Sequence, residues 1–187
     1  MEERLSRTIA LVNQKGGVGK TTSSINIGAG LAKAGKKVLL VDLDPQGNLT
    51  VSLGIEAHKC EATIFELLKG DYTATEAIIK GEYDVIPADI RLSGADMELS
   101  AVPGREMLLK EALAPIAENY DYILIDCPPS LGLITLNGLT AAREIFIPLQ
   151  AEFLALNGMA QLLNTVKAVQ KRLNPQLDVT GIVATLY

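Results

Sequence analysis

The sequence predicts a single α/β domain with a doubly wound, mainly parallel sheet and helices on both faces. Short apolar segments rich in β-branched residues alternate with helical patterns, as in sheets whose strands are joined by right-handed crossovers. Hydrophobic residues make up 48% of the 187 residues but aromatic residues only 4%. The core must therefore consist of Val, Ile, Leu and Ala, which is typical of buried parallel strands. A chain of this length fits one domain rather than two.

Six segments are expected to be strands because they are short, apolar and rich in β-branched residues. They are 8–13, 37–42, 83–87, 122–126, 144–149 and 179–186. Three longer helices are expected at 20–34, 105–118 and 156–173, and two short ones at 63–69 and 75–79. Gly35 follows the first helix, where a C-terminal glycine is common. Pro115 is expected to kink the second helix or to end it early.

Composition restricts the classes of function. The net charge of −5 gives no support to nucleic-acid binding by overall attraction, although a local basic patch is compatible with it. Cys60 and Cys127 are far apart, so a disulfide framework or a zinc site is not expected. No apolar run approaches the roughly 18 residues of a membrane span. We expect a cytoplasmic protein with no membrane partner.

The chain stops at the sequence ATLY, at or just after an apolar strand and without a closing helix. We therefore expect residues 1–187 to form one domain that lacks its C-terminal part. A natural end at an edge strand is the alternative.

Residues 13–22 read NQKGGVGKTT and lie between a strand and a helix. An ordinary phosphate-binding loop reads G-x-x-x-x-G-K-[ST], but here Gln14 replaces the first glycine and a second lysine, Lys15, is present. Glycines let backbone N–H groups surround phosphate oxygens, and the helix dipole assists them. The candidate nucleotide-binding residues are Lys15, Gly16, Gly17, Val18, Gly19, Lys20, Thr21 and Thr22. Lys20 is expected to neutralise the phosphates, and the hydroxyl of Thr21 to bind Mg²⁺.

Acidic residues follow two other predicted strands. Asp42 and Asp44 lie in VLLVDLDPQGN, where they could organise Mg²⁺, position a water molecule or cap a turn. Asp126 lies in YILIDCPPSLG, a Walker B pattern whose carboxylate holds Mg²⁺. Glu152 and Asn157, after the fifth strand, could line the nucleotide or a partner surface, or start the next helix.

These motifs together resemble those of one family. KGGVGKTT matches the deviant Walker A motif of the MinD/ParA superfamily of P-loop ATPases, and DLDPQGN, DCPPSLG and PLQAEFLAL are similar to its ParA/Soj branch, the chromosome- and plasmid-partitioning ATPases. The resemblance extends over nearly the whole chain. It implies a P-loop NTPase fold of the SIMIBI type, with ATP and Mg²⁺ as cofactors.

The resemblance also implies roles for single residues. Lys15 would reach the phosphates bound by the partner subunit of an ATP-dependent homodimer, and Asp44 would orient the attacking water. Asp42 would lie near the Mg²⁺ site, and Asp126 would be the Walker B acid. The implied function is DNA segregation, with weak ATP hydrolysis stimulated by a ParB-like partner and non-specific DNA binding through basic residues mostly beyond residue 187. A location at the bacterial or archaeal nucleoid follows.

Two alternatives stay open. One is a positioning or regulatory ATPase of the MinD type that does not act on DNA. The other is a P-loop synthetase of the dethiobiotin or cobyrinic acid type, although the sequence shows no motif for a carboxylate-substrate pocket and DPQGN argues against this class.

Overall fold

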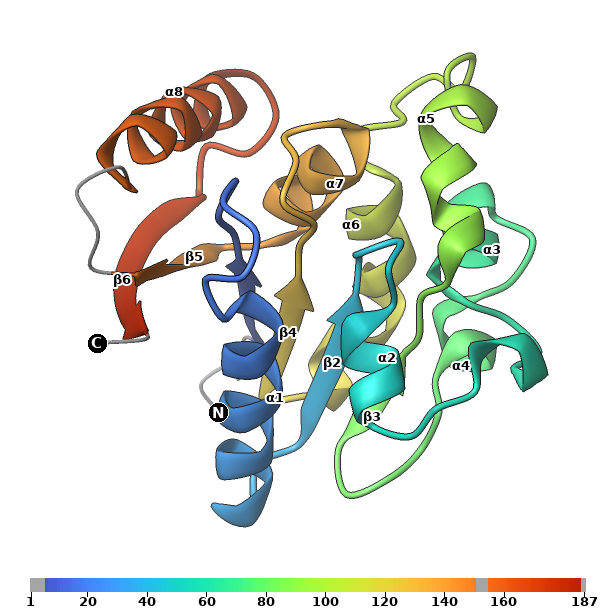
Figure 1. The fold of residues 1–187 in the computed structure, drawn as a ribbon. Coiled ribbons are helices and arrows are strands. Elements are labelled where there is room, and N and C mark those ends of the chain that lie inside the picture. Colours follow the sequence, from blue (N-terminus) through green and yellow to red (C-terminus); the bar gives the residue numbers. More distant parts are fainter. Residues whose placement is uncertain (1–5, 151–154, 186–187) are drawn as a thin grey trace.

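The computed structural model describes residues 6–150 and 155–185, and in these ranges a six-stranded sheet forms the centre of the molecule (Figure 1). The strands lie in the order β3-β2-β4-β1-β5-β6, and neighbouring strands run parallel. Their bounds are β1 Arg7–Leu11, β2 Val38–Asp42, β3 Asp84–Ile86, β4 Tyr122–Asp126, β5 Glu144–Gln150 and β6 Asp178–Thr185. The predicted strands are confirmed to within two residues, except that Leu186 lies outside the described ranges.

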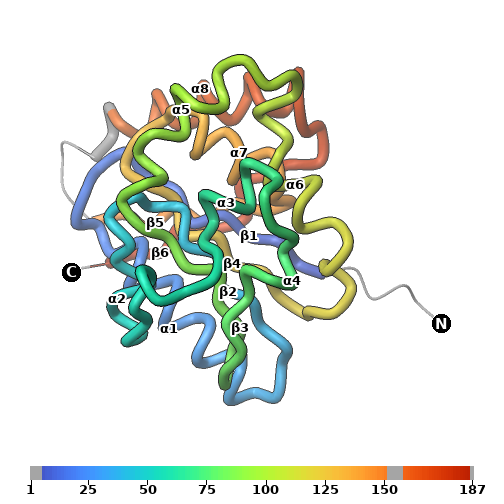
Figure 2. Tube along the Cα trace, turned by 90° about the vertical axis from the view of Figure 1, so that its right-hand side faces the viewer, coloured from blue at the N-terminus to red at the C-terminus, as the bar shows by residue number. Residues whose placement is uncertain are grey.

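Helices cover both faces of the sheet (Figures 1 and 2). On one face, Ile25 and Leu31 of α1 and Leu49 of α2 pack against apolar side chains of the sheet, and the other helices pack on the opposite face. The α-helices are α1 Lys20–Lys33, α2 Asn48–Ser52, α3 Ile64–Lys69, α4 Ala74–Ala77, α5 Ala95–Glu98, α6 Leu108–Leu113, α7 Leu133–Ala141 and α8 Ala155–Arg172. Short 3₁₀ helices are η1 Ala57–Lys59, η2 Ile90–Gly94 and η3 Ala114–Asn119. The predicted doubly wound fold is confirmed.

The prediction of one helix over 105–118 is wrong in its extent but right about Pro115. The α-helix begins only at Leu108 and ends at Leu113, and Pro115 lies in the first turn of η3. Proline has no N–H to continue an α-helical hydrogen-bond ladder, which is why the helix ends before it. Gly35, with φ +75°, adopts the left-handed conformation that ends α1 as predicted.

Helix α7 was not predicted from the sequence. Its sequence, LITLNGLTA, has no polar stripe, and six of its nine residues are buried. An amphipathic pattern therefore could not indicate it, because a helix buried nearly all round has no hydrophobic face to distinguish. In the described part of the chain, no helix has both the length and the apolar character that crossing a bilayer requires.

The register of the sheet brings three strand ends together. Leu11, the last residue of β1, pairs with Asp126 at the end of β4, and Asp126 also pairs with Asp42 at the end of β2. Loops at the carboxyl ends of parallel strands are where ligands bind in open α/β sheets. The fold therefore places the three candidate segments of the sequence at one edge.

Candidate functional site

Residues 12–19 form a loop between β1 and α1, and two of its glycines need their freedom of conformation. Gly17 and Gly19 have φ of +74° and +86°, the left-handed region that other residues rarely adopt. Gly16 and Gly17 have no atom within 4 Å of the place where a Cβ would lie. Val18, by contrast, is buried. The loop thus presents open backbone at the N-terminus of α1, a geometry that suits a phosphate group.

The ammonium group of Lys20 lies inside this loop. Its Nζ donates to the backbone oxygen of Lys15 over 3.2 Å, and the residue is 7% exposed. Burial lowers the pKa of Lys20, and the negative charges of Asp126 and Asp44 oppose that effect. A cation is therefore held where a bound phosphate would place its negative charge.

Lys15 points to a different part of the molecule. The residue is exposed, and its Nζ lies 3.4 Å from Oε1 of Gln150 at the end of β5. Its backbone N–H donates to Oδ1 of Asn13 over 3.0 Å, while Nδ2 of Asn13 donates to the carbonyl of Pro148. The two lysines of the loop thus occupy separate positions, one inside it and one on its outer surface.

Asp126 lies beside the first turn of α1. Its Oδ2 accepts a 2.7 Å hydrogen bond from the hydroxyl of Thr21, and its Oδ1 accepts one of 3.3 Å from Ser24. Asp126 is 1% exposed, and burial raises the pKa of its carboxyl to about 7, while the hydrogen bond from Thr21 acts in the opposite direction. The structure thus brings the predicted pair of Thr21 and Asp126 together.

Asp42 and Asp44 have different surroundings. Asp42 is fully buried and accepts three hydrogen bonds, from the backbone N–H of Asp44 and from the N–H and hydroxyl of Thr50. Burial raises the pKa of Asp42, and the hydrogen bonds from Thr50 oppose this. Asp44 accepts a 2.9 Å hydrogen bond from the N–H of Gln46, which closes a turn.

The oxygen atoms of Thr21 and Asp126 fit a magnesium ion. Mg²⁺ prefers hard oxygen ligands and is commonly held by one or two carboxylates together with phosphate oxygens and water, rather than by an all-protein cage. Within residues 6–150 and 155–185, no three His, Cys, Asp or Glu side chains converge on one point. The donors therefore suit an ion that a nucleotide helps to bind.

Ser24 and Thr50 were missed by the sequence analysis. Ser24 follows Thr21 by three residues on α1, so the two hydroxyls lie on one side of the helix and face Asp126. That spacing could have indicated Ser24. Thr50 lies in α2, which was not predicted, and its contact with Asp42 has no signal in the sequence.

The loop that carries Asp44 and the loop that follows Asp126 both line a cavity of about 240 Å³. It is lined by Pro45 of the first loop and by Pro128, Ser130 and Gly132 of the second. Glu152 and the side chain of Asn157 lie outside what the structure describes.

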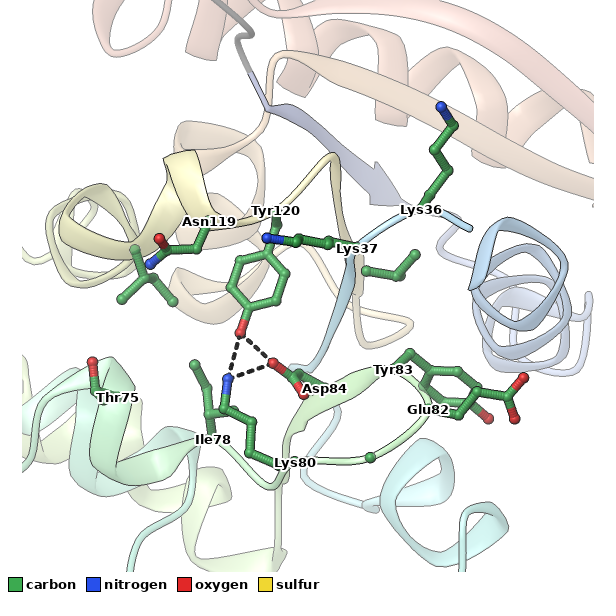
Figure 3. Close-up of a pocket in the computed structure, with 13 residues that line it drawn as sticks. Lys36, Lys37, Thr75, Ile78, Lys80, Glu82, Tyr83, Asp84, Asn119 and Tyr120 are labelled. Atoms are coloured by element: carbon green, nitrogen blue, oxygen red, sulfur yellow. Dashed lines mark hydrogen bonds and ion pairs between the residues drawn. The ribbon is translucent and has the colours of Figure 1, made fainter. Parts of the chain in front are cut away.

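A larger cavity, of about 430 Å³, lies at the opposite, amino-terminal edge of the sheet (Figure 3). There Asp84 accepts a 2.5 Å hydrogen bond from the hydroxyl of Tyr120 and forms an ion pair with Lys80. Burial raises the pKa of Tyr120 to about 12. These groups satisfy one another, and the cavity is remote from the phosphate loop.

Comparisons with known proteins agree with this geometry. The family model described as an AAA domain (AAA_31) matches residues 6–179. The chain is 53% identical to the sporulation initiation inhibitor protein Soj of Bacillus subtilis, over 97% of this chain and 73% of that protein. It is 48% identical to the chromosome partitioning protein ParA of Caulobacter vibrioides, over 97% of this chain and 70% of the relative. The chain belongs to the ParA/Soj family.

A crystal structure of a protein named as a synthase is also similar to this ParA/Soj chain. The cobyrinic acid a,c-diamide synthase of Mycobacterium smegmatis, solved with bound ADP and magnesium, superposes with a TM-score of 0.94. It is 48% identical, and the match covers 98% of this chain and 76% of that one. The resemblance to the ParA/Soj branch of the P-loop ATPases that the motifs indicated is confirmed.

Proposed function

We propose that this ParA/Soj chain is an Mg²⁺-dependent ATPase for DNA segregation, in which ATP binding drives dimerisation and non-specific DNA binding. The observation that carries the proposal is the separation of the two loop lysines. Lys20 lies inside the loop, 3.2 Å from the carbonyl of Lys15, whereas the side chain of Lys15 lies on the outside of the loop near Gln150. A single nucleotide needs only the inner cation, and the outer one lies on the exposed surface, where a second subunit would contact it.

The phosphate groups of ATP would be bound by the backbone N–H groups of the loop from Gly16 to Gly19 and by the first turn of α1. Lys20 would neutralise the β- and γ-phosphates, and the hydroxyl of Thr22, which is exposed, would donate to a phosphate oxygen. Thr21 and Asp126 would hold Mg²⁺, which when bound neutralises charge that develops on the transferred phosphoryl group. The ADP and magnesium in the Mycobacterium smegmatis relative support this assignment.

Asp44 would orient the attacking water molecule, because Asp44 lies on the loop beside the phosphate site. Lys15 of each subunit would stabilise negative charge on the nucleotide of the other, as an arginine finger does. Such a cation supplied in trans is worth roughly a thousandfold or more in rate. Turnover would thus be slow in the monomer, and a ParB-like partner would stimulate the DNA-bound dimer.

The role of Lys15 is tested by Lys15→Ala, with Lys33→Ala as the control because Lys33 is an exposed lysine at the far end of α1. We expect Lys15→Ala to abolish ATP-dependent dimerisation in analytical ultracentrifugation and to lower the ATPase rate by about a thousandfold. Binding of a fluorescent ATP analogue by the monomer should persist. Survival of both dimerisation and hydrolysis in Lys15→Ala contradicts the proposal.

The role of Asp44 is tested by Asp44→Ala. We expect this variant to bind ATP and to dimerise, while ATP hydrolysis falls to the background rate. Loss of nucleotide binding instead would make Asp44 a structural residue of the loop.

The proposal places the protein in the cytoplasm, at the nucleoid. The net charge of −5 does not support DNA binding, which therefore rests on membership of the family. ATP-dependent retention of the protein on non-specific DNA is the assay that decides this part. If ATP drives dimerisation but DNA is not retained, a positioning ATPase of the MinD type is the better description.

The name of the Mycobacterium smegmatis relative favours a second candidate, an ATP-dependent amide synthase. An enzyme of that kind couples ATP hydrolysis to activation of a substrate carboxylate, so its turnover depends on that substrate. Steady ATPase activity that increases with DNA and not with cobyrinic acid would exclude the synthase. Strict dependence on cobyrinic acid would exclude partition.

A further inference from the structure

The hydroxyl group of Thr50 links two segments that are far apart in the chain. Its Oγ1 donates to Oδ2 of Asp42 over 2.7 Å and accepts from the backbone N–H of Ala88 over 2.9 Å. The backbone N–H of Thr50 also donates to Oδ2 of Asp42, over 3.0 Å. Thr50 and Asp42 are fully buried and Ala88 is 1% exposed, so water does not compete for these bonds.

The same carboxylate holds the backbone of Asp44. Oδ1 of Asp42 accepts a 3.1 Å hydrogen bond from the N–H of Asp44. The two oxygens of Asp42 thus serve different partners: one fixes α2 through Thr50, and the other fixes the residue proposed to orient water. Rotation of the Asp42 carboxylate would release Asp44, and the two bonds from Thr50 prevent that rotation.

A close backbone contact closes the loop on its other side. Gly47 has φ +60°, and a Cβ at this position would lie 2.9 Å from the carbonyl oxygen of Ala88. Residues 44–50 are therefore held against the segment after β3 by the Thr50 hydrogen bond and by this packing. The position of Asp44 is determined by Ala88 as well as by its own strand.

We propose that Thr50 is a positioning residue for ATP hydrolysis, which fixes the Asp42 carboxylate and through it the backbone of Asp44. This inference rests on the proposed function, in which Asp44 orients the attacking water. It gives Asp42 a role in positioning, in place of the role in organising Mg²⁺ that the sequence analysis considered for it. Neither Thr50 nor Asp42 needs to touch the nucleotide.

The first experiment compares Thr50→Val with Thr50→Ser. Valine keeps the shape and the backbone N–H bond to Asp42, but it loses the hydroxyl that bonds to Asp42 and Ala88. Serine keeps that hydroxyl. A displacement of about 1 Å in a catalytic group costs up to about a hundredfold in rate. We therefore expect Thr50→Val to lower kcat by about 10- to 100-fold with the KM for ATP changed by less than about threefold. Thr50→Ser should stay within about threefold of the wild-type kcat.

Thr140→Val is the matched control. Thr140 is 1% exposed, and among the described residues its hydroxyl donates to the carbonyl of Leu136 in its own helix. This variant also loses a buried hydroxyl, so it measures the effect of general destabilisation on kcat, and its rate should equal that of the wild type. If Thr140→Val and Thr50→Val lose the same fraction of kcat, the positioning role is refuted.

A second readout does not use catalysis. Hydrogen–deuterium exchange of the nucleotide-free protein should be faster in Thr50→Val for peptides that cover 43–50 and 87–89. Exchange in the phosphate loop, residues 13–20, should be unchanged. Equal exchange of 43–50 in the variant and the wild type would show that Thr50 does not fix this loop, and would refute the inference whatever the ATPase rate.

Asp42→Asn provides an independent variant if Thr50→Val does not fold. The single oxygen of an asparagine can accept from Thr50 or from the N–H of Asp44, but not from both in the observed geometry. We expect a lower kcat at an unchanged Mg²⁺ requirement for nucleotide binding. A raised Mg²⁺ requirement would instead make Asp42 a metal ligand and overturn its positioning role.

The failure of this inference and that of the proposed function can be told apart. If Asp44→Ala stops hydrolysis but Thr50→Val does not alter kcat, only the role of Thr50 is refuted. If the loop exchanges faster in Thr50→Val while neither variant affects hydrolysis, Asp44 does not orient the water, and the proposed mechanism fails.

Discussion

Replacing Asp126 by Asn should stabilise the nucleotide-free protein at neutral and alkaline pH, although it removes a proposed Mg²⁺ ligand. Asp126 is 1% exposed, and burial raises the pKa of its carboxyl to about 7. In the unfolded chain this carboxyl ionises near pH 4. Between these values the folded protein keeps a proton that the unfolded chain has lost, so the free energy of unfolding falls as the pH rises to about 7 and is then constant.

The magnitude follows from the width of that window. Each pH unit in which only the folded state holds the proton lowers the free energy of unfolding by about 1.4 kcal/mol. Between pH 5 and pH 7 the wild type should therefore lose about 3 kcal/mol that Asp126→Asn, which has no such proton, does not lose. With a slope of roughly 2 kcal/mol per molar urea, the difference between the two midpoints should change by about 1.5 M.

The assay is urea unfolding at pH 5 and pH 8, without nucleotide or Mg²⁺. Glu118→Gln serves as the control, because Glu118 is an exposed carboxylate on η3 and its removal should leave the pH dependence of the wild type intact. A difference between wild type and Asp126→Asn that is the same at both pH values would refute the reasoning. It would mean that the carboxylate is ionised at pH 5 in the folded protein, stabilised by its hydrogen bonds.

Two further predictions concern stability. Gly47→Ala should lower the free energy of unfolding by about 1–2 kcal/mol because of its left-handed backbone, and by a further amount because of the contact with the Ala88 carbonyl. Gly54 has φ +73° and no atom within 4 Å of the place where a Cβ would lie. In urea unfolding, Gly54→Ala should therefore lose only the backbone contribution. Equal losses would contradict the role of the contact. Asn174, which is 6% exposed, donates from its Nδ2 to three carbonyls near the end of α7, so Asn174→Leu should lower the unfolding free energy by about 2–3 kcal/mol. The exposed Asn164→Leu on α8 should change the thermal midpoint little, and a similar shift in both variants would argue against the carbonyl cap.

The fold was predictable because its signals are local. Each strand is a short β-branched run, and Gly35 and Pro115 mark real ends of helical segments. The phosphate loop was equally clear, since glycines, Lys20 and Thr21 occur together between a strand and a helix. Patterns of this kind need no knowledge of distant contacts.

What the sequence could not show depends on contacts between distant segments. The bond between Thr50 and Ala88 joins α2 to the segment after β3, and no spacing rule relates these two residues. The sequence could identify Asp42 as a polar residue at a strand end. It could not show that the carboxylate oxygens of Asp42 accept hydrogen bonds from Thr50 and Asp44. Helix α7 was not predicted, because a helix buried on all sides lacks the periodic alternation of apolar and polar residues.

The position of β1 in the sheet has a consequence for how the protein folds. This strand leaves the ribosome before the other strands of the sheet, but its neighbours β4 and β5 lie at residues 122–126 and 144–150. Pairings between strands so far apart in the chain close large loops and form slowly. The phosphate loop follows β1 directly, so it acquires its final shape only after most of the chain has been synthesised. Nucleotide therefore cannot guide the early steps of folding, and during synthesis the apolar face of β1 stays exposed to chaperones and to aggregation.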